Sequence, residues 1–142
     1  MSPHLRKLFE TTPLGADVGL LLVRLWFGTT LALAHGLGKV SDLGNFTSKV
    51  ASKVPLAEIL GPAAALSEFL GGLFFAVGFL TRPAAFLMFT TMMVAGFHIH
   101  SADPFAKKEL AFAIGIAALS VLVAGPGKLS VDQWLLSRFN RR

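Results

Sequence analysis

Long apolar runs with very few charges make up most of the chain. Arg24 is the one formal charge in residues 18–34, and Glu68 is the one in residues 59–80. Residues 83–97 carry none. At about 1.5 Å per residue, such runs are long enough to cross a hydrocarbon core of about 30 Å. The pattern predicts an all-α integral membrane protein, a bundle of four transmembrane helices at about 15–36, 56–80, 83–99 and 105–124.

Turn residues set the expected helix ends. Pro83 begins the third helix after a tight turn, and Gly125-Pro126-Gly127 ends the fourth. Ser130 with Gln133 forms a capping box, which predicts a last, interfacial helix at about 130–140. Glycines in the connection at 37–55 should prevent one continuous helix there. The spacing of its apolar residues predicts one short interfacial helix within the connection. Residues 1–12 read as an amphipathic start lying at the membrane surface.

Composition agrees with a membrane protein of one domain, residues 1–142. Charged residues make up 15% of the chain, against about a quarter in soluble domains. The net charge is +5 and the pI about 10.1. Because the basic residues lie in tails and short connections, they suit anionic lipid headgroups, so the lipid bilayer is the expected partner. No basic run carries interleaved aromatics, which argues against nucleic acid.

The distribution of Lys and Arg predicts the orientation. The two tails and the turn after the second helix hold seven of them; the opposite face holds five. The positive-inside rule then places both termini in the cytoplasm, for a multi-pass protein of the inner (cell) membrane. Ala32-Leu33-Ala34 also reads like a signal-peptide cleavage site. The long apolar segment and Arg24 favour a retained helix instead.

The chain has no cysteine and no tyrosine. Thiolate nucleophiles, iron–sulfur clusters and Cys-ligated zinc are therefore excluded. Any chemistry depends on His, Arg, Lys, Asp or Glu, or on a borrowed molecule.

Arg24 and Glu68 are the two charges expected near the bilayer midplane. A charge there costs roughly 2.5–3.5 kcal/mol on insertion scales, so opposite charges at matching depth favour an ion pair between them. One interpretation is a bridge that only fixes helix packing. The other is a polar centre that binds a ligand or relays protons.

A second polar group is expected at the non-cytoplasmic end. His35 shares a helix face with Arg24, and Lys39 lies four positions further on. His98 ends the third helix and Glu109 begins the fourth, so all should reach one level. Ligand-binding or proton-relay candidates are therefore Arg24, His35, Lys39, Glu68, His98 and Glu109, whereas His100 should lie on another face and meet water. A haem on the two histidines, a metal on these and Glu109, or a small-solute passage are further alternatives.

The order and spacing of several motifs resemble the DoxX family of small four-helix membrane proteins, from about Gly19 to Asp132. The matching residues are Arg24-Leu25, Gly28, His35-Gly36, Lys39, Glu68, Gly71, Gly72, Gly78, Thr81-Arg82, His98, Glu109, Gly125-Pro126-Gly127, Ser130 and Asp132.

The resemblance implies a link to redox metabolism. The wider group includes a subunit of a thiosulfate:quinone oxidoreductase and a membrane partner in oxidative-stress complexes. Thiol-handling branches use cysteines, which are absent here, so a quinone or similar lipophilic redox molecule is the expected ligand, with no covalent cofactor. The alternative is a non-enzymatic structural or docking subunit. A redox enzyme partner or a homo-oligomer is expected in either case.

Overall fold

The computed structural model describes residues 13–140, and the regular elements in that range are helices. The all-α expectation is thus confirmed for the described residues. The amphipathic start expected over residues 1–12 lies outside them.

The first helix is longer than expected. α2 (Pro13–Thr29), the π-helical segment η1 (Thr30–Gly36) and α3 (Leu37–Ser41) follow one another without a break. The expected end at Gly36 was wrong. A helical glycine costs only about 1 kcal/mol, which packing against a neighbouring helix readily offsets. Asp42 ends the helix with a non-helical backbone, and its side chain caps α4 (Leu43–Val50).

The second and third helices also contain π-helical segments. The second comprises α5 (Ala57–Leu66), η2 (Ser67–Gly71) and α6 (Gly72–Val77), and ends at Gly78. The third comprises α7 (Thr81–Val94) and η3 (Ala95–Ile99). The second ends three residues before the expected position, because Gly78 adopts a left-handed φ of 74°.

The last two helices match their expected bounds closely. α8 spans Phe105–Ala124, and α9 spans Val131–Phe139. The Ser130 half of the expected capping box is present, since the backbone N–H of Gln133 donates to Ser130 Oγ at 3.2 Å.

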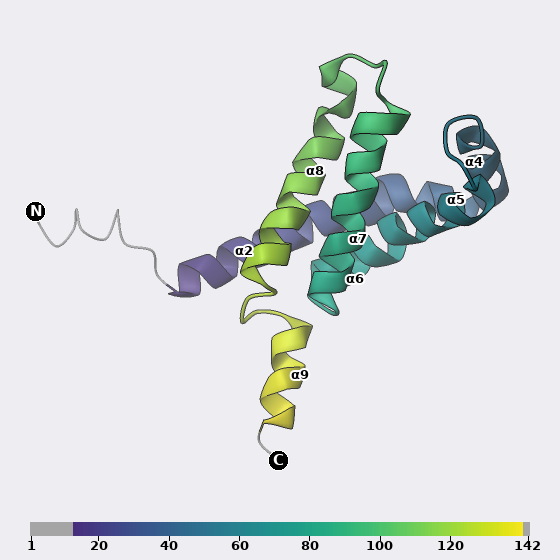
Figure 1. Ribbon diagram of the computed structural model, residues 1–142. Coiled ribbons are helices and arrows are strands. Elements are labelled where there is room, and N and C mark those ends of the chain that lie inside the picture. The colour runs from purple at the N-terminus through teal and green to yellow at the C-terminus, as the bar shows by residue number, and fades with distance from the viewer. Residues whose placement is uncertain (1–12, 141–142) are drawn as a thin grey trace, which may run out of the picture.

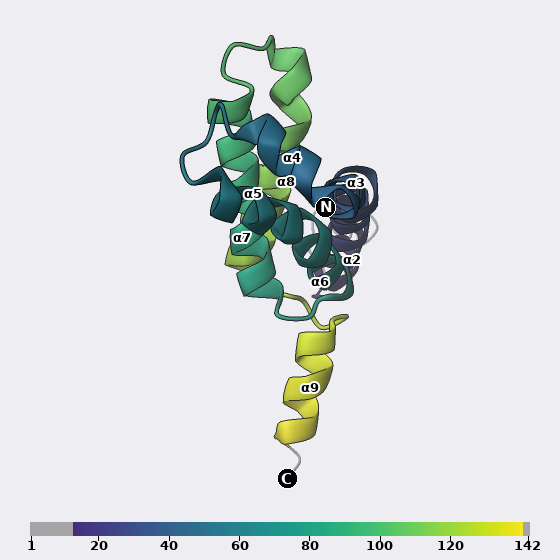
Figure 2. The ribbon, with the colours of Figure 1, turned by 90° about the vertical axis from the view of Figure 1, so that its right-hand side faces the viewer.

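The helices pack as two pairs that cross each other. α7 lies alongside α8, and α2 packs on α6 (Figures 1 and 2). Phe75, Met88 and Ile114 belong to the buried core between the pairs. α9 has no buried residue and projects away from the other helices (Figures 1 and 2).

Much of the outer surface is apolar. The helical stretches Leu14–Ser41 and Ala57–Val77 are each long and apolar enough to cross a membrane. Large hydrophobic side chains stand outward on them and on α8, among them Trp26, Ile59 and Val123. Such a surface suits hydrocarbon rather than water.

Candidate functional site

Three π-helical segments meet at one place in the fold. Leu31 and His35 from η1, Glu68 from η2 and Ala95 from η3 line the same cavity. A π-helical turn inserts an extra residue into an α-helix and is frequently found at functional sites. The candidate functional site therefore lies at this meeting point.

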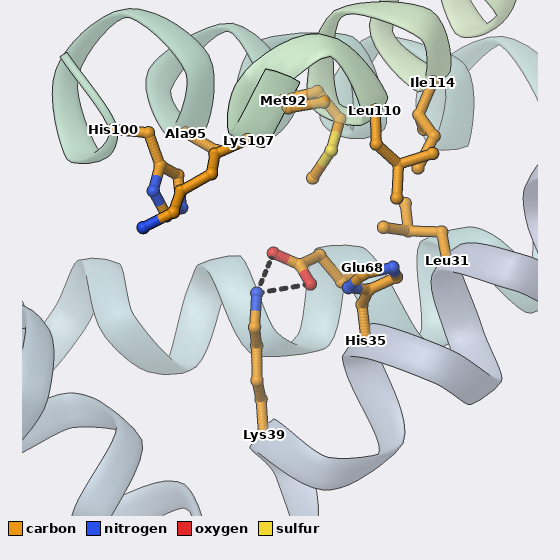
Figure 3. A pocket seen from close by; sticks show the side chains of 11 residues that line it. Leu31, His35, Lys39, Glu68, Met92, Ala95, His100, Lys107, Leu110 and Ile114 are labelled. Atoms are coloured by element: carbon orange, nitrogen blue, oxygen red, sulfur yellow. Dashed lines mark hydrogen bonds and ion pairs between the residues drawn. The ribbon is translucent and has the colours of Figure 1, made fainter. Parts of the chain in front are cut away.

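An ion pair between Lys39 and Glu68 forms the centre of the site. Lys39 Nζ donates to both carboxylate oxygens of Glu68, each at 2.5 Å (Figure 3). The side chain of Glu68 is 3% exposed and that of Lys39 is 30% exposed. Lys39 Nζ also lies 5.0 Å from the centre of the Phe46 ring. The buried carboxylate is thus neutralised by an ammonium group that still reaches an open space.

A small polar chamber opens beside this pair. Its volume is about 130 Å³. Figure 3 shows the side chains that line it. The polar lining residues are His35, Lys39, Glu68, His100 and Lys107, and the apolar ones are Leu31, Met92, Ala95, Leu110, Ala111 and Ile114. Basic side chains on three helices therefore surround a single carboxylate.

A larger apolar groove adjoins the polar chamber. It measures about 390 Å³ and lies between α4 and α5 on one side and α7 and η3 on the other. The groove and the chamber share four lining residues, which are Lys39, Glu68, Ala95 and His100. The ion pair therefore stands at the junction of a polar and an apolar space.

The expected ion pair between Arg24 and Glu68 is wrong. Small residues set the register of the two helices: a Cβ on Gly36 would come within 2.5 Å of the backbone N of Phe69. Glu68 consequently lies level with the His35 and Lys39 end of the first helix. Arg24 lies level with Gly78, ten residues or about 15 Å further along the second helix.

Arg24 belongs instead to a structural cluster at the other end of the helices. It is fully buried, and its Nη2 donates to the carbonyl of Leu129 at 2.5 Å. Its Nε and Nη1 have no hydrogen-bond partner within the described residues. Asp132 supplies the nearby negative charge. That carboxylate accepts hydrogen bonds from the backbone of Leu80 and Thr81 and from the Thr81 hydroxyl.

The structure brings together only some of the residues expected at the non-cytoplasmic level. His35 and Lys39 line the chamber with Glu68, whereas His98 and Glu109 are exposed and lie outside both spaces. The Nε2 of His98 lies 2.5 Å from the carbonyl of Lys53. His35 and His98 therefore do not form a haem-ligand pair, and within residues 13–140 no three acidic or histidine side chains group to hold a metal.

His100 is a site residue that sequence reasoning missed. It was expected to face water on another side of the helix, but it is half-buried and lines both spaces. His100 follows η3 directly, and its backbone N–H donates to the carbonyl of Ala95, five residues earlier. The π turn therefore changes the direction in which the later side chains point. Its Nδ1–H donates to Asp103 at 2.7 Å, which lowers the pKa of Asp103.

Lys107 and Met92 were also missed. Lys107 lies in the exposed first turn of α8, where a lysine ordinarily reaches water. Met92 reads as an ordinary core residue, and its side chain extends toward the carboxylate of Glu68 in Figure 3. A chain position alone does not distinguish these residues from their neighbours.

Apolar helices of spanning length, a hydrocarbon-like outer surface and a buried ion pair define a helical membrane protein. The DoxX family model matches residues 19–101, which is more than half of the chain. The chain belongs to the DoxX family.

A curated relative agrees with this class. The chain is 29% identical over 123 residues to the Inner membrane protein YqjF of Escherichia coli (strain K12), covering 84% of this chain and 93% of that protein. No solved structure matches the chain.

Proposed function

We propose that this protein binds a quinone or a similar lipophilic redox molecule at the Lys39–Glu68 pair, as a membrane subunit of an oxidoreductase system. The observation that carries the proposal is the position of this pair, at the junction of the polar chamber and the apolar groove. Ligand sites are typically apolar cavities with a few convergent polar groups.

The polar side chains suit the carbonyl oxygens of such a ring. The Lys39 ammonium has three N–H donors. Two of them donate to Glu68, which leaves one for a ligand oxygen. A positive charge there stabilises negative charge that develops on that oxygen. Glu68, His35 and His100 are the groups that hold or deliver protons when a partner subunit supplies the electrons.

The proposed topology is four membrane-spanning helices with both termini in the cytoplasm. The excess of Lys and Arg on that side supports it, and the similarity to an inner membrane protein supports the location. The polar chamber would then open toward the periplasmic side.

The test is direct recovery of the ligand. The protein is purified in mild detergent from wild type, His35→Ala, Glu68→Gln and the exposed control Glu109→Gln, and extracted lipophiles are quantified by mass spectrometry. We expect quinone in stoichiometric amounts with wild type and the control, and at least fivefold less with the two site variants. Equal amounts of quinone in all four proteins, or no quinone in wild type, would contradict the proposal.

A docking subunit is the second candidate function. α9 supports it, because this helix has no buried residue and projects from the molecule (Figures 1 and 2). On α9 the Arg138 guanidinium lies 4.9 Å from the Trp134 ring. Such an amphipathic helix suits either a membrane surface or a partner protein, including a second copy of the chain. A redox enzyme that co-purifies with wild type but not with Trp134→Ala would favour this candidate.

A further inference from the structure

We propose that the ligand is a long-chain lipid with a single-ring head, bound with its ring in the polar chamber and its hydrocarbon tail in the apolar groove. This inference rests on the proposed function and narrows its ligand class. It assigns the apolar groove the role of binding the hydrocarbon tail.

The polar chamber has the size of one ring. Its volume is about 130 Å³. An apolar protein cavity of about 150 Å³ is known to hold one benzene molecule. A single six-membered ring therefore fills the chamber, and a tail attached to it has to leave through an adjoining space.

The apolar groove is that space. It is about three times as large as the chamber and begins at the same ion pair. Its walls are largely aliphatic, with Val50, Val54, Leu60, Leu87, Val94 and Ile99 among the lining residues.

The hydroxyl groups in the groove are already bonded within the protein. Thr90 Oγ1 donates to the carbonyl of Phe86, and Thr91 Oγ1 donates to Ser67 Oγ, both at 3.0 Å. These threonines therefore do not require a polar partner from a ligand. The groove carries charges at the Lys39–Glu68 pair, and the rest of its walls is mostly aliphatic. This distribution matches a lipid with one polar head and one hydrocarbon tail.

Small residues line the groove along α5. Gly61, Ala63 and Ala64 form part of its wall. A larger side chain at Ala64 would project into the space that a tail needs. Two hydrogen bonds fasten the α4–α5 connection over this region: Lys53 Nζ donates to the carbonyl of Ile99 at 2.9 Å, and the ring of His98 donates to the carbonyl of Lys53. His98 thus helps to hold the groove's shape without touching the chamber.

Tail length is a poor readout, because a tail in a bilayer is already surrounded by hydrocarbon and gains little from burial. The position of the tail is a better one. The probe is a benzoquinone with a decyl tail that ends in a photoreactive diazirine, added to the protein in lipid nanodiscs. Crosslinked peptides are then mapped by mass spectrometry.

We expect saturable labelling of the groove segments of α5 and α7, displaced by untagged decyl-benzoquinone. Ala64→Phe should reduce this labelling at least fivefold, whereas Ala113→Phe, the same change at an exposed position of α8, should leave it unchanged. A phosphatidylcholine with a diazirine on its acyl chain serves as the comparison lipid. It should label the outer helix faces without displacement by the quinone.

Three results would overturn the inference. They are quinone labelling confined to outer faces such as those of Leu22 and Val123, equal and non-displaceable groove labelling by the phospholipid, and no saturable labelling at all. Recovery of stoichiometric quinone by extraction, together with any of these results, would refute the tail site and leave the proposed function standing. Absence of extracted quinone would refute the proposed function itself.

Discussion

The guanidinium of Arg24 occupies the space where a side chain would stand on Gly78. A Cβ built on Gly78 would overlap Arg24 Nη1 and lie 2.6 Å from the Cβ of Ser130. Gly78 also has a φ of 74°, which disfavours other residues. With the bond from Arg24 to Leu129, this contact joins the first helix, the α6–α7 turn and the segment before α9. Arg24 is therefore a residue of the structural framework.

Gly78→Ala should be strongly destabilising. The left-handed backbone and the collision with Arg24 should together lower the free energy of unfolding by about 3 kcal/mol. Gly127→Ala is the matched control, because Gly127 has the same φ of 74° but its nearest neighbour would be Leu20 Cδ1 at 3.3 Å. We expect about 1 kcal/mol there, measured by unfolding in mixed micelles. Equal losses would show that Arg24 does not fill this space.

Asp132→Asn should also weaken the framework. The change removes the negative charge near Arg24 and weakens the bonds to the start of α7. We expect a loss of about 2 kcal/mol in the free energy of unfolding. Asp42→Asn, an exposed cap of α4, should cost less than about 1 kcal/mol in the same assay. A loss at Asp132 no larger than at Asp42 would argue against the cluster.

Lys39 and Glu68 should be energetically coupled. Either Lys39→Met or Glu68→Gln alone leaves a charge without its partner, while the double variant leaves none. A double-mutant cycle on unfolding should therefore give a coupling of about 2 kcal/mol. The parallel cycle of Arg24→Met with Glu68→Gln should give a value near zero. The reverse ranking would restore the Arg24–Glu68 pair that the sequence suggested.

His100 should control the titration of Asp103. The hydrogen bond from His100 lowers the pKa of Asp103, so the stabilising effect of this contact is present above the ordinary aspartate pKa and disappears as pH falls through the lowered value. His100→Ala should raise the pKa of Asp103, as followed by carboxyl NMR. His98→Ala is the control and should change it far less. An unchanged pKa in the His100 variant would disprove the contact.

Much of the helix plan follows from the sequence, because apolar runs and turn residues are local signals. α8 has the expected bounds, and Ser130 caps α9 as its spacing predicts. The family resemblance is confirmed by the match over residues 19–101. The four-helix membrane topology, the single domain and the orientation of the termini stay predictions.

The site was harder to predict, because it depends on register and on π-helical turns. Arg24 and Glu68 match in depth when each is counted from its own helix end. The close contacts of Gly28 with Gly72 and of Gly36 with Phe69 fix a different register, one that pairs Glu68 with Lys39. The glycines are visible in the sequence, but the residues that they contact on the neighbouring helix are not.

The most direct test concerns the binding of the ring head by Lys39. The dissociation constant of decyl-benzoquinone, expressed per lipid, should be measured in nanodiscs for wild type, Lys39→Met and the exposed control Lys49→Met. The double variant Lys39→Met/Glu68→Gln removes the buried carboxylate that Lys39→Met alone leaves unpaired. We predict a rise of at least tenfold, about 1.4 kcal/mol, whenever Lys39 is replaced, and no change for Lys49→Met. Equal dissociation constants in all four proteins would contradict a ligand site at the Lys39–Glu68 pair.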